Sequence, residues 1–263
     1  IELYVEKRCI SMGKQCTYFI SNCWSIKNDT CVINGKEYHM TQHGFARHNE
    51  FETNQVSDTE VIFSLKSNDE IIKQYPFLFE LNVTYRLVEN KLKCHIEVKN
   101  TDHQPIYFQV GGHPAFACPF MENESSNDYY LEFSENETCN RKIIDVEKRG
   151  MSRVEKPFFD NEKRFFVRQE LFNTDAIVIK NFKSENIALK SLNHDKSIVF
   201  HMNGFDHVGL WAAKHVGGLI AIEPWVGHAD YTDFNGEFKE KESCVELPVG
   251  KNFEVEFAVE INQ

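Results

Sequence analysis

The sequence predicts an all-β protein built as one large antiparallel β-sandwich, and two observations support this prediction. Long runs of residues alternate between apolar and polar types, which places one face of a strand on a core and the other toward water. Helical periodicity is scarce, while turn residues separate many short strand-like runs. We expect residues 1–263 to form a single domain, because all-β sandwiches reach this length without dividing.

The alternation is clearest in three runs, at residues 79–87, 92–99 and 253–261. Glu89, Asn90 and Lys91 join the first two runs, which predicts a hairpin. Shorter runs predict strands near 50–56, 60–66, 105–111, 128–134, 176–181, 186–191, 197–203, 207–212 and 218–223.

Helices and loops take little of the chain. One short helix is expected at residues 69–74, with Asn68 as its N-cap. Two stretches, the polar residues 122–128 and the charged residues 147–164, are interpreted as surface loops.

Composition narrows the classes of partner and compartment. The formal charge of −11 disfavours binding to nucleic acid or to an anionic membrane surface. No apolar run approaches the roughly 20 residues that span a bilayer, and the charged residues 1–8 do not resemble a secretory signal. We therefore expect a cytoplasmic protein, monomeric or homodimeric. The eight cysteines lack a C-x-x-C pair, so free thiols are expected instead of a cysteine metal site.

Three polar segments rich in glycine or proline interrupt the strands, at residues 42–47, 111–116 and 222–230. In the second, Gly111 and Gly112 allow a close approach of the backbone or a positive φ. His113 follows them and precedes a proline, which holds it in an extended conformation. Its imidazole is a candidate proton donor near neutral pH.

The third segment carries a carboxylate in an apolar setting. Glu223 ends an apolar run and precedes a proline, so it needs hydrogen bonds or has a raised pKa. Trp225 offers a flat apolar face of the kind that sugar sites use, and His43 and Arg47 of the first segment are donors suited to hydroxyl groups. Taken singly, each of these residues has a commoner structural explanation, such as a loop histidine or a solvated arginine.

The order of the motifs along the chain favours a functional explanation of these residues over a structural one. The chain contains HGFAR (43–47), NEFE (49–52), YPF (75–77), GGHPAF (111–116), GLW (209–211) and IEPW followed by Gly227. In this order, over roughly residues 27–262, the chain resembles the aldose 1-epimerase family. The similarity is greatest to its bacterial, lactose-operon-associated branch of galactose-mutarotase-like proteins.

The resemblance implies a β-supersandwich that binds a free aldose in a shallow, open cleft and interconverts its α and β anomers. It implies that His113 is the general acid at the ring oxygen and Glu223 the general base at the anomeric hydroxyl. It also implies that His43 and Arg47 hold sugar hydroxyls, with Asp206 as a weaker match to an acidic residue of the same role. No metal, cofactor or covalent intermediate is required.

The start of the chain departs from the family. Residues 16–26 replace a segment similar to APILFPIVGQL, although the flanking residues match. A gain of one base near the Gln15 codon and a loss of one near the Lys27 codon would produce this difference, and resequencing the DNA tests the hypothesis. We also expect roughly 20–30 residues of the family's N-terminal strands to be missing.

Three other functions stay open at this point. A hexose-6-phosphate 1-epimerase shares the fold and the acid–base pair but requires a cluster of arginines for the phosphate. A non-catalytic sugar-binding protein could use the same fold. A metal hydrolase could use His39, His43, His113 and His228, although none of these has a recognised metal-binding spacing.

Overall fold

The computed structural model describes residues 19–20, 26–212 and 218–263. Its strands are β1 (Phe19–Ile20), β2 (Thr30–Ile33), β3 (Lys36–His39), β4 (Glu52–Ser57), β5 (Glu60–Lys66), β6 (Phe79–Val88), β7 (Lys91–Asn100), β8 (Ile106–Phe108), β9 (Val110–Gly111), β10 (Ala115–Ala117), β11 (Tyr129–Asp145), β12 (Gly150–Phe166), β13 (Ile177–Lys180), β14 (Asn186–Ser191), β15 (Ser197–Asn203), β16 (His207–Trp211), β17 (Leu219–Val226), β18 (Val245–Leu247) and β19 (Asn252–Asn262). The helices are short: η1 (Lys27–Asp29), η2 (Ala46–His48), α2 (Asp69–Ile72), η3 (Ser126–Asp128), η4 (Gln169–Phe172) and η5 (Phe238–Glu240).

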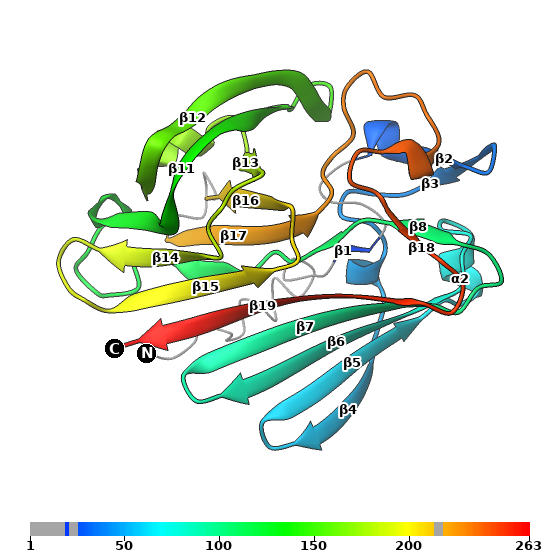
Figure 1. Ribbon diagram of the computed structural model, residues 1–263, viewed down its shortest axis with the longest axis horizontal. Coiled ribbons are helices and arrows are strands. Elements are labelled where there is room, and N and C mark those ends of the chain that lie inside the picture. The colour runs from blue at the N-terminus through cyan, green and yellow to red at the C-terminus, as the bar shows by residue number, and fades with distance from the viewer. Residues whose placement is uncertain (1–18, 21–25, 213–217) are drawn as a thin grey trace.

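Fifteen strands of the described residues form one antiparallel sheet, which confirms the predicted fold class. Its order is β1-β9-β17-β16-β13-β11-β14-β15-β19-β7-β6-β5-β4, with β10 on β17 and β12 on β11. The sheet folds over itself, so that β4 to β7 and β19 lie along one side and β11, β13, β16 and β17 along the other (Figure 1). Across the core, the rings of Phe116 on β10 and Phe200 on β15 lie 6.1 Å apart.

The most regular sequence patterns give the most regular strands. The three alternating runs form β6, β7 and β19, and Val88 pairs with Lys91 across a tight turn in which Glu89 has a φ of 54°. The predicted helix is present but ends at Ile72, and the side chain of Asn68 caps it by accepting from two backbone N–H groups at 3.0 and 2.9 Å. No helix in the described ranges is long and apolar enough to cross a membrane.

The interpretation of residues 147–164 as a loop is wrong. Most of this stretch belongs to β12, which pairs with an extended β11 as a long hairpin (Figure 1). β12 has β11 as its strand partner and is largely exposed, so few of its residues need to be apolar. Register shifts within the pair also break the period of two. A strand was therefore missed because its sequence is charged and lacks a regular alternation.

β17 positions the candidate site because it is buried on both faces. Ile220 and Ile222 point into the main core, while Trp225 lies in a smaller apolar cluster with Val178 and Ala229 on the opposite face. Glu223 shares the second face, since residues two apart on a strand point the same way. A carboxylate is thus held on a central strand, next to an apolar cluster.

The hypothesis on residues 16–26 stays a hypothesis, because most of this segment lies outside the described residues. Two of its members, Phe19 and Ile20, form β1 and pair with Gly111 and Val110. Since His113 follows Gly111 closely, β1 lies near the candidate site.

Candidate active site

The structure brings together the two residues predicted to exchange protons. Nε2 of His113 lies 3.3 Å from Oε1 of Glu223, although the residues are 110 positions apart in the chain. The His113 side chain is 20% exposed and that of Glu223 only 3%. The expected open cleft between them is not the arrangement seen, because the two groups touch. A ligand that lies between them must first separate them.

Two glycines explain how the segments approach so closely. A Cβ on Gly111 would lie 2.7 Å from the carbonyl oxygen of Pro224, and one on Gly112 would lie 3.0 Å from the ring of Phe257. The N–H of Gly112 instead donates to the Pro224 carbonyl at 3.0 Å. The predicted close approach is confirmed, whereas neither glycine has a positive φ. Larger residues here would push His113 away from β17.

Burial controls the protonation of the pair. Burial lowers the pKa of His113 to about 4, and the charge of Arg47 acts in the same direction. Burial also raises the pKa of Glu223 well above that of an ordinary carboxyl; the charge of Asp175 adds to this shift, and the indole N–H of Trp225 opposes it. Both shifts favour neutral groups. The pair therefore holds one proton, on the carboxyl, which faces a neutral imidazole.

Replacing Glu223 with Gln should stabilise the fold increasingly as the pH rises above about 4.5, the ordinary pKa of a carboxyl, toward the raised pKa of Glu223. In the unfolded chain this carboxyl ionises at its ordinary pKa, whereas the raised pKa in the fold retains the proton, so unfolding releases a proton and alkali destabilises the protein. The stability difference between variant and wild type should grow by about 1.4 kcal/mol per pH unit within this window. Denaturant unfolding of both proteins at several pH values measures it, and a difference that does not change with pH would contradict the raised pKa.

His43 and Arg47, the two residues expected to hold sugar hydroxyls, both lie beside His113. The rings of His43 and His113 meet edge to face with their centroids 5.8 Å apart. Burial, then the charges of His113 and Arg47, lower the pKa of His43 well below its ordinary value, so its imidazole is neutral. Its φ of 63° is unusual for a residue other than glycine, and strain of this kind is often found at functional sites. Nε of Arg47 is buried and donates no hydrogen bond within the described residues, so a donor is available to a ligand.

Two further residues belong to the site, and the site prediction did not include them. Asp175, whose φ is 90°, precedes β13, and its charge helps to raise the pKa of Glu223. Trp211 ends β16, is half-buried, and its ring meets that of His113 at a centroid distance of 5.8 Å. The GLW motif contains Trp211 and could have indicated it, whereas nothing in the sequence around Asp175 marks it as functional.

Trp225 does not have the exposed face that the sequence analysis assigned to it. Its side chain is completely buried. The ring lies against two backbone segments that have no side chains, because a Cβ on Gly111 or on Gly209 would come within 2.8 or 2.9 Å of it. Trp225 therefore supports Glu223 from within the apolar cluster, and a sugar cannot pack on it in this arrangement.

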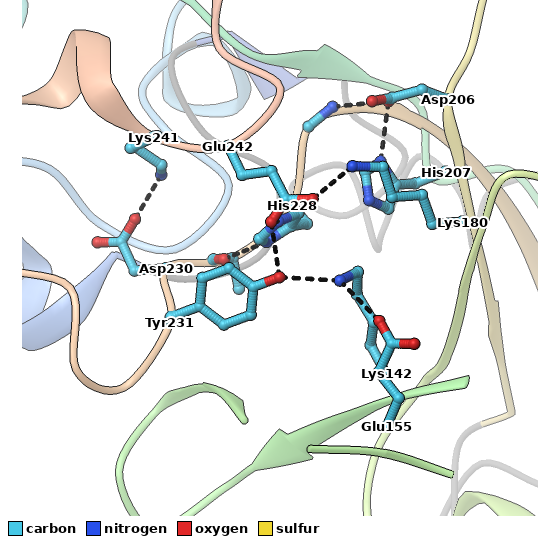
Figure 2. A network of polar contacts seen from close by, with 12 residues as sticks. Lys142, Glu155, Lys180, Asp206, His207, His228, Asp230, Tyr231, Lys241 and Glu242 are labelled. Carbon is cyan, nitrogen blue, oxygen red and sulfur yellow. Dashed lines mark hydrogen bonds and ion pairs between the residues drawn. The ribbon is translucent and has the colours of Figure 1, made fainter. Parts of the chain in front are cut away.

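Asp206 lies in a different group of polar residues, shown in Figure 2. Its carboxylate accepts from the N–H of Gly227 at 3.0 Å and lies 2.9 Å from Nδ1 of His207. Burial alone would raise the pKa of Asp206, but hydrogen bonds from His207, Ser243 and Gly227 lower it to about 2. These contacts hold the start of β16 against the end of β17. They give no support to the predicted role of Asp206 in binding sugar hydroxyls.

The same network continues through His228, Tyr231 and Glu242 to Lys142 (Figure 2). Each cation in it has an acidic partner, including Lys180 with Glu242 and Lys142 with Glu155 at 3.2 Å. In the part of the chain that the structure describes, no three His, Cys, Asp or Glu side chains are placed to hold a metal ion. The four histidines considered for a metal hydrolase thus do not form a metal site there.

Comparisons with known proteins agree with this architecture. The family model described as aldose 1-epimerase matches residues 12–246. Protein LacX of Lactococcus lactis subsp. lactis is 33% identical over 219 residues, which cover 78% of this chain and 71% of that protein.

Two solved structures are similar over nearly the whole chain. A galactose mutarotase related enzyme from Lactobacillus acidophilus has a TM-score of 0.88 and 27% identity, covering 94% of this chain and 83% of its own. A galactose mutarotase-like protein from Lactobacillus casei has a TM-score of 0.86 and 26% identity, covering 94% and 85%. Given the extent of the family match and the identity to LacX, this chain belongs to the aldose 1-epimerase family.

Proposed function

We propose that this protein is a mutarotase that interconverts the α and β anomers of a free hexose by general acid–base catalysis. The observation that carries the proposal is the contact of His113 with Glu223 at 3.3 Å in a buried site. The reaction requires one group that takes a proton and one that gives a proton at the same time. A pair that holds a single proton between a carboxyl and an imidazole meets this requirement.

The chemistry follows from the proton count. One group removes the proton from the anomeric hydroxyl while the other protonates the ring oxygen, and the bond between C1 and the ring oxygen breaks. Rotation about C1–C2 in the open aldehyde exposes the other face of the carbonyl, and the ring closes with the two roles reversed. Each cycle returns the pair to one proton. As the family resemblance implies, His113 acts at the ring oxygen and Glu223 at the anomeric hydroxyl.

The neutral state of the pair is compatible with these roles. A protonated carboxyl beside a neutral imidazole differs from a carboxylate beside an imidazolium only in the position of one proton, and the two atoms are 3.3 Å apart. A hexose that enters must replace this contact with hydrogen bonds from its own oxygens. The charges of Arg47 and Asp175 already act on His113 and Glu223, and in the proposed complex these two residues would bind neighbouring hydroxyls.

The charges around the pair favour a free sugar over a sugar phosphate. Arg47 is the cation whose charge acts on His113. Of the cations in the network of Figure 2, Lys142 and Lys180 are already paired with Glu155 and Glu242. A phosphate would need several unpaired cations to replace its water.

Polarimetry tests the proposal directly. A freshly dissolved α-anomer of glucose or galactose should reach its equilibrium rotation faster with the protein than in buffer, and Glu223→Gln should remove the acceleration. The 6-phosphates of the same sugars, followed by NMR, form the second arm. Rates for wild type and Glu223→Gln that both equal the rate in buffer would favour a protein that only binds sugar, and acceleration confined to the phosphates would favour the hexose-6-phosphate reaction.

The pH dependence of kcat/KM should show an acid limb near pH 4. Below the lowered pKa of His113 the imidazole takes a second proton, and the pair can no longer accept one from the anomeric hydroxyl. Above the raised pKa of Glu223 the shared proton is lost, which gives the alkaline limb. Initial rates corrected for spontaneous mutarotation measure the profile. An acid limb near pH 6.5, the ordinary value for histidine, would show that His113 is not buried in the active protein.

A further inference from the structure

The face of the sheet that carries Glu223 also carries Trp211, a half-buried aromatic residue. β13, β16 and β17 are neighbours, and their register places Gly209 between Val178 and Glu223. Two residues further along β16, on the same face, Trp211 pairs with the small Ala221. Trp211 is thus a diagonal neighbour of Glu223, at a separation that long side chains can bridge.

Contacts on two sides hold the Trp211 ring in place. It packs against the apolar cluster that contains Trp225, Val178 and Ala176. It also meets the His113 ring at 83°, with centroids 5.8 Å apart. Trp211 is half-buried, so it is partly exposed to solvent, and its ring lies next to that of His113. Trp225, in contrast, is completely buried.

We propose that Trp211 is the aromatic platform on which the C–H face of the hexose packs. This inference rests on the proposed function, since it assigns a binding role within that same site. A pyranose ring presents C–H groups on its faces and hydroxyls at its rim, so an aromatic face gains hydrophobic contact without opposing the polar groups. Sugar oxygens would then point to Arg47, Asp175 and the pair, while Trp211 supports the ring carbons next to them. The preferred ligands are pyranoses with an uninterrupted C–H face.

Kinetics with two variants separate this role from a structural one. Trp211→Leu removes the aromatic face but keeps an apolar side chain, and it should raise KM about tenfold, which corresponds to about 1.4 kcal/mol of binding, with kcat changed less than about threefold. Trp211→Phe keeps a smaller ring and should raise KM by about two- to threefold. The control is Phe166→Leu, which removes an exposed aromatic ring at the far end of β12 and should leave both constants unchanged. A fall in kcat with KM unchanged would overturn the proposal, because it would mean that Trp211 only orients His113.

A second measurement does not depend on catalysis. Methyl β-D-galactopyranoside and methyl β-D-glucopyranoside have no free anomeric hydroxyl, so they can bind but cannot open. Titration of the wild type with either glycoside should change the near-UV absorption of indole, and Trp211→Phe should lose most of that change while calorimetry still detects binding. If wild type shows the spectral change but no mutarotation, the proposed function fails and the platform stands. If mutarotation occurs and the glycosides leave the indole spectrum unchanged, the platform is wrong and the proposed function stands.

Discussion

Replacing Glu223 with Gln is expected to slow enzyme-catalysed mutarotation by about 10²–10⁴-fold, the usual contribution of one general acid–base group. The amide has nearly the same shape as the carboxyl, so the site should keep its geometry, but it cannot take or give a proton at the anomeric hydroxyl. Its lost activity cannot be attributed to unfolding, because we expect this variant to be more stable than wild type above pH 5. Polarimetry at saturating sugar, with unfolding curves on the same samples, measures both effects.

The matched experiment replaces His113 with Gln and then combines the two changes. Because the residues act as one proton-exchanging pair, His113→Gln alone should cost a similar factor, and the double variant should be little worse than either single one. Losses that multiply in the double variant would contradict a shared function. They would indicate two groups that act independently.

Breaking the buried ion pair of Lys241 with Asp230 is expected to destabilise the fold by about 3–5 kcal/mol. Nζ of Lys241 lies 2.7 Å from Oδ1 of Asp230, and the two side chains are only 3% and 4% exposed (Figure 2). The other carboxylate oxygen of Asp230 accepts from the N–H of Lys27 at 3.1 Å. Lys241→Met leaves a buried carboxylate without its cation, and Asp230→Asn leaves a buried ammonium without its anion, so each single change should be severe.

A double variant and an exposed pair provide the controls. Asp230→Asn combined with Lys241→Met removes both charges and keeps an acceptor for Lys27, so most of the lost stability should return. Lys73→Met breaks an ion pair of 2.6 Å to Glu70 in which both side chains are mostly exposed, and it should cost only about 0–1 kcal/mol. Denaturant unfolding of all four variants measures these differences. Additive losses in the double variant would show that the two charges do not depend on each other.

The strands that could be predicted from the sequence are those with one face buried in the core and the other exposed to solvent. β6, β7 and β19 have that property, and so their alternation is visible in the sequence. β12 does not, since most of its residues are exposed, and the charged residues that cover it resemble a loop. β17 is buried on both faces and was predicted only to its midpoint, because Glu223 and Pro224 interrupt the apolar run.

The candidate site was predictable where motifs mark it and not where only packing decides. The glycines and prolines around His113 and Glu223 revealed both segments, and the family resemblance alone indicated that they meet. Which tryptophan is exposed depends on the glycines opposite each ring, and that information is lacking in a single sequence. The influence of Asp175 on Glu223 depends on the neighbouring positions of β13 and β16 in the sheet, which local patterns do not reveal.

A crystal structure of the Glu223→Gln variant with a bound hexose tests the central claim most directly. The account predicts a pyranose between the side chains of residues 113 and 223, with its ring oxygen and anomeric oxygen each about 2.6–3.2 Å from one of them. The direct contact of His113 with Glu223 would then be absent. A hexose bound elsewhere on the protein, with residues 113 and 223 still in contact, would contradict the account.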